Sequence, residues 1–243
     1  MKLKIFAPAL LITIAGMLNN LNAQQAIENA LTPKQQGLIG IAAYTSKGDL
    51  LKLETALNAG LEAGLTVNQI KEILVHLYAY AGFPRSIRGL QTFMEVLDER
   101  KARGITDLTG AEASPVKDER SKYDRGKAML DTLLSAPQNG PRTGYSAFAP
   151  IIDTFLKVHL FADIFERDVL THSERELVTV SVLSSIGVVE PMLRSHLNIC
   201  LHAGLTPVQL QQFVKIIEST TGEKEGKAAQ IVLDDVLKSH RRQ

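Results

Sequence analysis

Tryptophan is absent from this 243-residue sequence, and aromatic residues make up only 5% of it. The chain therefore has little from which to build the stacking platforms that hold single-stranded nucleic acid. Its charges almost cancel, because 27 basic residues face 26 acidic ones and leave a net charge of +1. A balance of this kind provides no field that attracts nucleic acid or an anionic membrane surface. We expect neither as a partner of the mature protein.

Cysteine occurs once, as Cys200. A single cysteine excludes an intramolecular disulfide and any Cys-x-x-Cys pair for zinc or redox chemistry. The six histidines include no pair at i, i+4 and no His-Glu-x-x-His motif. We expect no metal site.

Strand signals are also missing, since no run alternates with period two and no Asn-Gly or Asp-Gly turn separates two strand-like runs. Apolar residues recur instead at spacings of three and four, as in Leu50, Leu53, Leu57 and Leu61. The sequence predicts an all-α fold. Its 45% hydrophobic content suffices for one large core or two modest ones.

The N-terminus has the pattern of a secretory signal peptide. Residues 1–4 carry two lysines and make a short basic start. Residues 5–18 are apolar apart from three interruptions, and residues 19–23 form a small, polar exit. The apolar run is too short for a comfortable membrane span, although a membrane-anchoring helix is the alternative. We expect cleavage near Ala23 and a periplasmic or secreted protein.

The rest of the chain contains an internal duplication. Residues 63–66, Ala-Gly-Leu-Thr, recur as residues 203–206, an offset of 206 − 66 = 140. Farther upstream the offset is 139. Each copy has two helix starts in which a threonine is followed three residues later by Gln or Glu, the pattern of a capping box, at Thr32, Thr66, Thr171 and Thr206. We predict two copies of one helical unit.

These copies suggest the domain division. Residues 24–104 form a first, truncated unit, residues 105–120 a polar linker, and residues 121–243 a second, complete unit with a helical preamble that the first lacks. A copy of this size buries its apolar stripe poorly alone, so we expect the halves to pack on each other.

In the first copy, Glu72, His76 and Tyr80 stand at i, i+4 and i+8 and therefore line one stripe of a helix. They offer an acid, an imidazole and a phenol, which together suit acid–base chemistry. The alternative is a solvated helix edge with one tyrosine in the core.

That helix ends at residues 82–84, Gly-Phe-Pro, and the next one begins with Arg85 and Arg88. Free N–H groups at a helix start and two guanidinium groups favour an anion. The pattern indicates a small carboxylate substrate.

In the second copy, Glu176 lies near a predicted helix N-terminus and His196 follows twenty residues later. A carboxylate beside an imidazole makes a proton-transfer pair. The alternative is a surface glutamate with a half-buried, hydrogen-bonded histidine.

Several motifs together resemble the carboxymuconolactone decarboxylase family, which includes the alkylhydroperoxidase-D-like proteins. They are Gly-Leu-Thr followed by a helix that ends in Tyr-Ala-Tyr-Ala-Gly-Phe-Pro-Arg (78–85), Arg-Glu-Leu-Val (175–178), Ser-His-Leu-Asn (195–198), and the preamble segments 123–126 and 162–167. The resemblance covers about residues 30–237 as two units. It implies helical units that form homo-oligomers such as trimers or hexamers, without a metal or organic cofactor. The family contains lactone decarboxylases and peroxidases.

The peroxidases of the family need a Cys-x-x-Cys motif before the histidine, which here would fall on Val189 and Met192. Cys200, one turn after His196, is the redox candidate that remains. A lone cysteine in such a helix is more often a small core residue.

The two copies lack complementary groups. Glu176 and His196 correspond to Gly37 and Ala56, so the first copy lacks the acid and the imidazole. The second copy lacks the aromatic–proline–arginine corner, because Tyr80, Phe83, Pro84 and Arg85 correspond to Thr220, Glu223, Lys224 and Glu225. We therefore predict one composite site per chain.

The resemblance implies an enzyme that acts on a small carboxylate or lactone by acid–base chemistry, and the signal-like N-terminus indicates that this enzyme is exported. Glu176 would orient His196, and His196 or Tyr80 would deliver a proton to the dienolate left by loss of carbon dioxide. Substrate binding would fall to Arg85, Arg88, Phe83, His76 and Glu72. The alternatives are a peroxidase that relies on Cys200 and a non-catalytic helical assembly module. Export leaves the substrate open, because catabolism of that lactone is expected in the cytoplasm.

Overall fold

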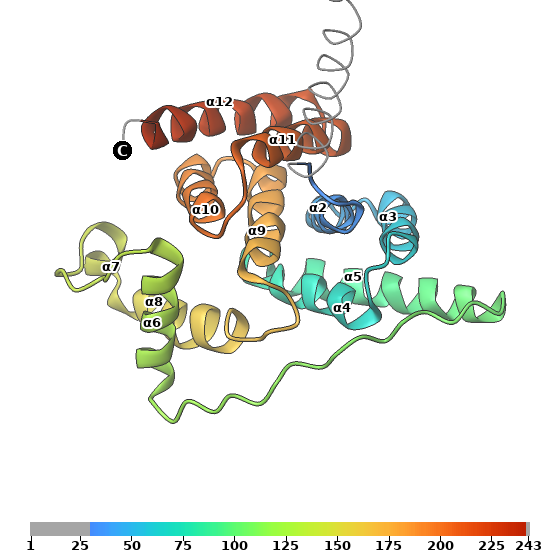
Figure 1. The fold of residues 1–243 in the computed structure, drawn as a ribbon, viewed down its shortest axis with the longest axis horizontal. Helices are drawn as coiled ribbons and strands as arrows, with labels where there is room; N and C mark the ends of the chain where they lie inside the picture. Colours follow the sequence, from blue (N-terminus) through green and yellow to red (C-terminus); the bar gives the residue numbers. More distant parts are fainter. Residues whose placement is uncertain (1–29, 242–243) are drawn as a thin grey trace, which may run out of the picture.

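The computed structural model describes residues 30–241, and every regular element in that range is a helix (Figure 1). The predicted signal peptide lies outside the described residues. The first unit contains α2 (Pro33–Lys47), α3 (Leu50–Glu62), α4 (Val67–His76) and α5 (Tyr78–Ala102). The second contains α9 (His172–Ile186), α10 (Glu190–His202), α11 (Pro207–Thr221) and α12 (Glu223–His240). No helix between residues 30 and 241 is long and apolar enough to cross a membrane.

The duplication is visible in the helix bounds. An offset of 139 moves α2 onto α9, since 33 + 139 = 172 and 47 + 139 = 186. An offset of 140 moves α3 onto α10, since 50 + 140 = 190 and 62 + 140 = 202. The predicted capping boxes at Thr32, Thr66, Thr171 and Thr206 are all formed. The prediction of two copies of one helical unit is confirmed.

Both units resume a helix after a glycine in the left-handed region of φ. Gly82 has φ 82° and Gly222 has φ 116°, values that a side chain would make costly. The first unit has an additional interruption at Leu77, so α4 ends at His76 and not at Ala81 as the periodicity predicts. Tyr80 therefore lies in a short segment between two breaks.

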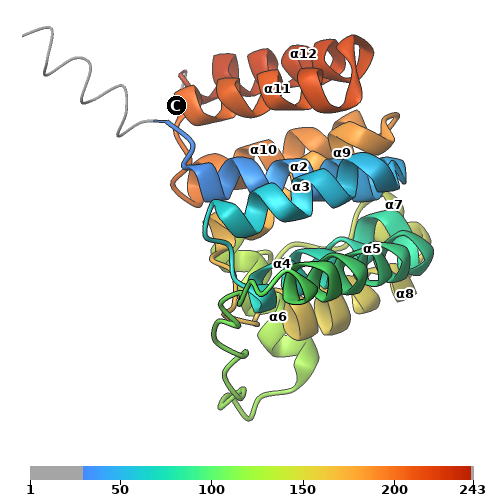
Figure 2. The same cartoon turned by 90° about the vertical axis from the view of Figure 1, so that its right-hand side faces the viewer.

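The helices form three layers (Figure 2). Helices α11 and α12 make one outer layer, α4 and α5 the other, and α2, α3, α9 and α10 lie between them. One hydrophobic core belongs mainly to the second unit but includes Ile39 and Ala43 of α2. The other belongs mainly to the first unit but includes Val178 and Val182 of α9. The two units thus pack on each other and share their interior.

The connector between the units binds the start of α4. Residues 105–119 have no regular structure. The carbonyls of Leu108 and Thr109 accept hydrogen bonds of 2.9 Å from the backbone N–H groups of Val67 and Asn68. These bonds satisfy donors that a helix N-terminus otherwise leaves unpaired.

The preamble comprises α6 (Lys122–Leu134), α7 (Gly144–Phe148), α8 (Pro150–Phe155) and a π-helix, η1 (Leu156–Ile164). The preamble is helical, as the sequence predicts, but its last part is a short α-helix followed by a nine-residue π-helix. Helix α6 lies very close to η1 at Gly126, where an added Cβ would be 1.7 Å from the carbonyl oxygen of Lys157.

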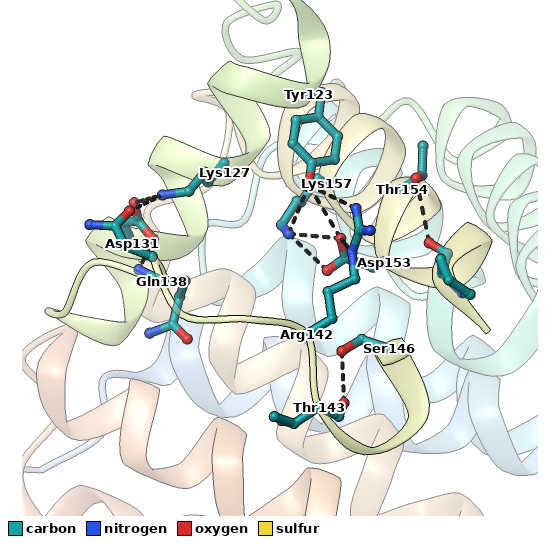
Figure 3. A network of polar contacts seen from close by, with 12 residues as sticks. Tyr123, Lys127, Asp131, Gln138, Arg142, Thr143, Ser146, Asp153, Thr154 and Lys157 are labelled. Atoms are coloured by element: carbon teal, nitrogen blue, oxygen red, sulfur yellow. Dashed lines mark hydrogen bonds and ion pairs between the residues drawn. The ribbon is translucent and has the colours of Figure 1, made fainter. Parts of the chain in front are cut away.

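A polar network also holds the preamble together (Figure 3). The Lys157 ammonium donates to both carboxylate oxygens of Asp153 at 2.8 Å and to the Tyr123 hydroxyl at 3.2 Å. Arg142 donates to the same carboxylate at 3.0 Å. The preamble is therefore tightly connected, and its apolar side chains pack against Ile199 of α10. The Phe165 ring, just after η1, contacts the ring of His76.

Candidate functional site

The predicted acid and imidazole of the second unit form a direct pair. The capping box at Thr171 starts α9 and places Glu176 in its second turn, where the side chain is fully buried. His196 of α10 lies opposite, with Nδ1 2.8 Å from Oε2 of Glu176. The His196 side chain is 14% exposed. The carboxylate thus holds one ring nitrogen and leaves Nε2 for a ligand.

Tyr80 of the first unit completes this arrangement. Its ring stands edge-on to the His196 ring, with centroids 5.7 Å apart and an interplanar angle of 86°. Burial, and next the nearby Glu176 carboxylate, raise the pKa of Tyr80. The neighbouring Thr179 hydroxyl and the Arg175 charge lower it by less. The phenol therefore remains protonated and can donate a hydrogen bond.

Two buried polar atoms at this point have no hydrogen-bond partner among the described residues. They are the Tyr80 hydroxyl and Oε1 of Glu176, and Nε of the neighbouring Arg175 is unpaired as well. Buried polar groups are nearly always hydrogen-bonded, so each unpaired one calls for an explanation. The two cavities described in the structure have other linings and include neither atom.

Glu72 and His76 lie behind Tyr80 in a buried network. The Glu72 carboxylate accepts hydrogen bonds from Arg167 at 2.9–3.0 Å and from Arg175 at 2.6 Å. His76 lies 2.9 Å from the Thr179 hydroxyl and 3.3 Å from Arg175. Burial, and next the Arg175 charge, hold the pKa of His76 well below its ordinary value. A ligand would have to displace protein partners to reach either residue.

Within residues 30–241 no group of three His, Cys, Asp or Glu side chains converges as metal ligands would. A model of the carboxymuconolactone decarboxylase family matches residues 8–93 and again residues 154–234. The chain belongs to this family. Each match falls on one of the two units, so this is a tandem member. The first match begins inside the predicted signal peptide, before the first described residue. No match was found among curated proteins.

In this decarboxylase-family chain, the predicted substrate-binding arginines lie apart from the Glu176–His196 pair. The Arg85 guanidinium packs against Gly48 at the C-terminal end of α2. Arg88 is exposed and donates to Gln91 at 3.0 Å. Neither makes a hydrogen bond to Glu176, His196 or Tyr80 in the described part of the chain. Phe83 is 62% exposed and stacks on Tyr78, with ring centroids 4.5 Å apart.

Cys200, the redox candidate, is a fully buried core residue. Burial, followed by the Glu176 charge, raises the pKa of this thiol well above its ordinary value. Both effects disfavour the thiolate that peroxide chemistry requires.

The position that corresponds to the candidate site in the first unit is an open groove of about 430 Å³ between α2, α3 and α11. Small or apolar residues line it where the second unit has its polar groups. Gly37, Ala56 and Ile216 occupy the positions of Glu176, His196 and His76, respectively. The pairing of an acid with an imidazole therefore exists at one of the two related positions.

Arg175, Arg167 and Thr179 are parts of the network that sequence reasoning missed. Arg175 stands in the Arg-Glu-Leu-Val motif, and a charged residue in an otherwise apolar helix is a signal that could identify it. Arg167 ends the preamble segment 162–167. Thr179 carries no such signal, because its role depends on helix α4 packing against α9.

Proposed function

We propose that this chain is an enzyme that transfers a proton, without a cofactor, to or from a carbon conjugated to the carbonyl of a small lactone or carboxylate substrate. The pairing of His196 with Glu176 beside the buried, unpartnered Tyr80 hydroxyl supports the proposal most strongly. An imidazole oriented by a carboxylate is a general acid and base, and a neutral phenol is a donor for a developing oxyanion.

For an unsaturated lactone acid, the reaction would be decarboxylation. The bond between the carboxylate carbon and the ring breaks, carbon dioxide leaves, and the electron pair moves into a dienolate. The Tyr80 hydroxyl donates a hydrogen bond to the dienolate oxygen, and protonated His196 delivers the Nε2 proton to carbon. The Glu176 carboxylate accepts a hydrogen bond from Nδ1–H of His196 throughout, and its charge stabilises the imidazolium before the Nε2 proton is transferred.

Recognition of the substrate falls mainly on its carbonyl oxygen. The geometry does not support the carboxylate clamp expected from Arg85, because that guanidinium lies against Gly48. Arg175 is close to Tyr80 but its terminal nitrogens bond Glu72, His76 and the Arg167 carbonyl. We therefore place the lactone carbonyl at Tyr80 and the reacting carbon at Nε2 of His196.

The first experiment follows release of carbon dioxide from 4-carboxymuconolactone, with His196→Ala as the control. Release by the wild type that the variant loses supports the proposal. No release by the wild type rejects this substrate. A panel of small unsaturated lactones and keto acids in D₂O, followed by proton NMR for exchange at carbon, then tests the reaction class.

A thiol peroxidase is the less favoured alternative, because Cys200 is buried and its pKa is raised. Hydroperoxide turnover that Cys200→Ser abolishes would revive it. A non-catalytic assembly module would show neither turnover nor proton exchange with any member of the panel.

Export and oligomerisation belong to the same proposal. The signal-like N-terminus supports cleavage near Ala23, which the mass of the protein purified from its native envelope or medium would test.

Large apolar side chains on α7 and α8 are exposed, among them Phe148 at 92%, and support a homo-oligomer such as a trimer or hexamer. Light scattering on the purified protein measures its mass; a monomeric mass contradicts this part.

A further inference from the structure

Arg175 directly precedes the candidate acid Glu176, yet its side chain takes part in a different set of bonds. It is fully buried and donates to the Glu72 carboxylate at 2.6 Å and to the backbone carbonyl of Arg167. Its third contact is Nδ1 of His76 at 3.3 Å. A guanidinium has donors only, so Nδ1 of His76 must be the acceptor.

The other nitrogen of His76 is fixed by the same kind of argument. Thr179 donates its hydroxyl proton to the backbone carbonyl of Arg175 at 3.0 Å, and a carbonyl can only accept. The hydroxyl oxygen of Thr179 therefore accepts from Nε2 of His76 at 2.9 Å. The bond pattern admits one form of His76, a neutral ring with its proton on Nε2.

This form matters for Tyr80, which stands between two imidazoles. The Tyr80 ring lies 5.6 Å from the His76 ring and 5.7 Å from the His196 ring, measured between centroids. Both nitrogens of His76 are occupied by Arg175 and Thr179, so His76 offers the Tyr80 hydroxyl no acceptor. A charged His76 would instead place a second cation beside His196 and disfavour its protonated form.

We propose that Arg175 is a positioning residue of the site, which holds His76 neutral with its proton on Nε2 and so reserves the Tyr80 hydroxyl for the ligand. The inference rests on the proposed function in one respect, the roles given to Tyr80 and His196. The groups that face His76 come from every element packed around it, namely Glu72 of its own helix, Tyr80, Phe165, Arg175, Thr179 and His196.

The experiment is long-range ¹H–¹⁵N NMR of the histidine rings in ¹⁵N-labelled full chain, with His76 assigned by the signal lost in His76→Gln. In the wild type at pH 7 we expect His76 to show the neutral pattern with Nε2 protonated. In Arg175→Met, Thr179 still accepts from Nε2, but Nδ1 loses its donor and the positive charge beside it. We therefore expect His76 to take up a second proton, on Nδ1, at a higher pH than in the wild type.

Arg167→Met is the matched control, since Arg167 bonds the same Glu72 carboxylate without contacting His76. There the His76 pattern should match the wild type. Wild-type His76 protonated on Nδ1 or on both nitrogens at pH 7 overturns the proposal. A His76 ring in Arg175→Met that titrates at the same pH as in the wild type also overturns it. If Arg175→Met does not fold, Arg175→Gln replaces it, because the neutral amide also removes the positive charge beside Nδ1 of His76; an unchanged His76 titration there also overturns the proposal.

The NMR result needs no substrate, so its failure and the failure of the proposed function are distinguishable. Where turnover is found, Arg175→Met should also change the pH profile, because a second imidazole beside His196 now titrates. Arg167→Met should keep the wild-type profile. A variant that only lost stability would lower the amount of active enzyme and leave the shape of the profile unchanged.

Discussion

Nδ1 of His196 lies 2.8 Å from Oε2 of Glu176, and the corresponding positions of the first unit hold Ala56 and Gly37. The first unit contributes Tyr80, whose ring stands 5.7 Å from that of His196. The geometry therefore combines groups from both units at one point. Duplication allows this, because each unit keeps its fold when one of the two related positions loses its polar groups.

Glu176→Gln tests the role of the carboxylate. Glutamine keeps the size of the side chain but lacks the charge that stabilises the imidazolium, so we expect kcat to fall by roughly two orders of magnitude or more. Steady-state kinetics on the substrate found by the panel measure this. Glu119→Gln, on the exposed linker, is the control and should retain wild-type kcat. Equal kcat for Glu176→Gln and wild type would contradict the assignment.

Tyr80→Phe separates activity from stability. The change removes one buried hydroxyl that has no hydrogen-bond partner among the described residues, so the free energy of unfolding should stay level or rise by about 1 kcal/mol. Activity should fall, because the donor to the substrate oxygen is lost. Urea unfolding and kinetics on the same samples make the comparison, with exposed Tyr145→Phe as the control. A stability loss above about 1 kcal/mol would indicate a hydrogen bond that the structure does not show.

His76 predicts a pH dependence of stability. Its folded-state pKa is held well below the ordinary value of 6.5 by burial and then by Arg175. Below pH 6.5 the unfolded chain therefore binds a proton that the folded chain excludes, and the free energy of unfolding falls as the pH decreases, by up to about 1.4 kcal/mol per unit from this group.

Urea unfolding between pH 7 and pH 5 tests that slope. The decline should be shallower in His76→Gln than in the wild type, whereas exposed His240→Gln should follow the wild type. A His76→Gln slope equal to that of the wild type would mean that His76 binds a proton equally in both states.

Gly126→Ala tests the close packing of the preamble. The added methyl would lie 1.7 Å from the Lys157 carbonyl oxygen, so α6 and η1 must separate. Overpacking of this kind costs about 1–3 kcal/mol or more in the free energy of unfolding. Gly140→Ala, where no atom lies within 4 Å of the added Cβ, should change it by less than about 0.5 kcal/mol. Equal stability of the two variants would show that the contact can relax.

The parts of this structure that depend on local chemistry were predictable from sequence. The capping boxes at Thr32, Thr66, Thr171 and Thr206 and the break at Gly82 need only neighbouring residues, and they gave the fold and the duplication. The pairing of His196 with Glu176 was one of two interpretations of the second copy, and the family resemblance favoured it.

The remaining features depend on tertiary contacts. Periodicity shows that Glu72, His76 and Tyr80 share a helix stripe, but it cannot show that Arg175 and Thr179 of another helix occupy the first two. It also cannot show that the Arg85 guanidinium lies against Gly48, although Arg85 follows Tyr80 by only five residues. The breaks at Leu77 and Gly82 set the directions in which these two side chains point.

The central claim is that His196, Glu176 and Tyr80 form one proton-transfer site. Deuterium incorporation at carbon, measured by proton NMR for the lactone and keto acid panel in D₂O, tests it most directly. We predict incorporation with the wild type, loss of at least 100-fold in His196→Gln, and a marked decrease in Tyr80→Phe. Incorporation by His196→Gln at the wild-type rate would contradict the account.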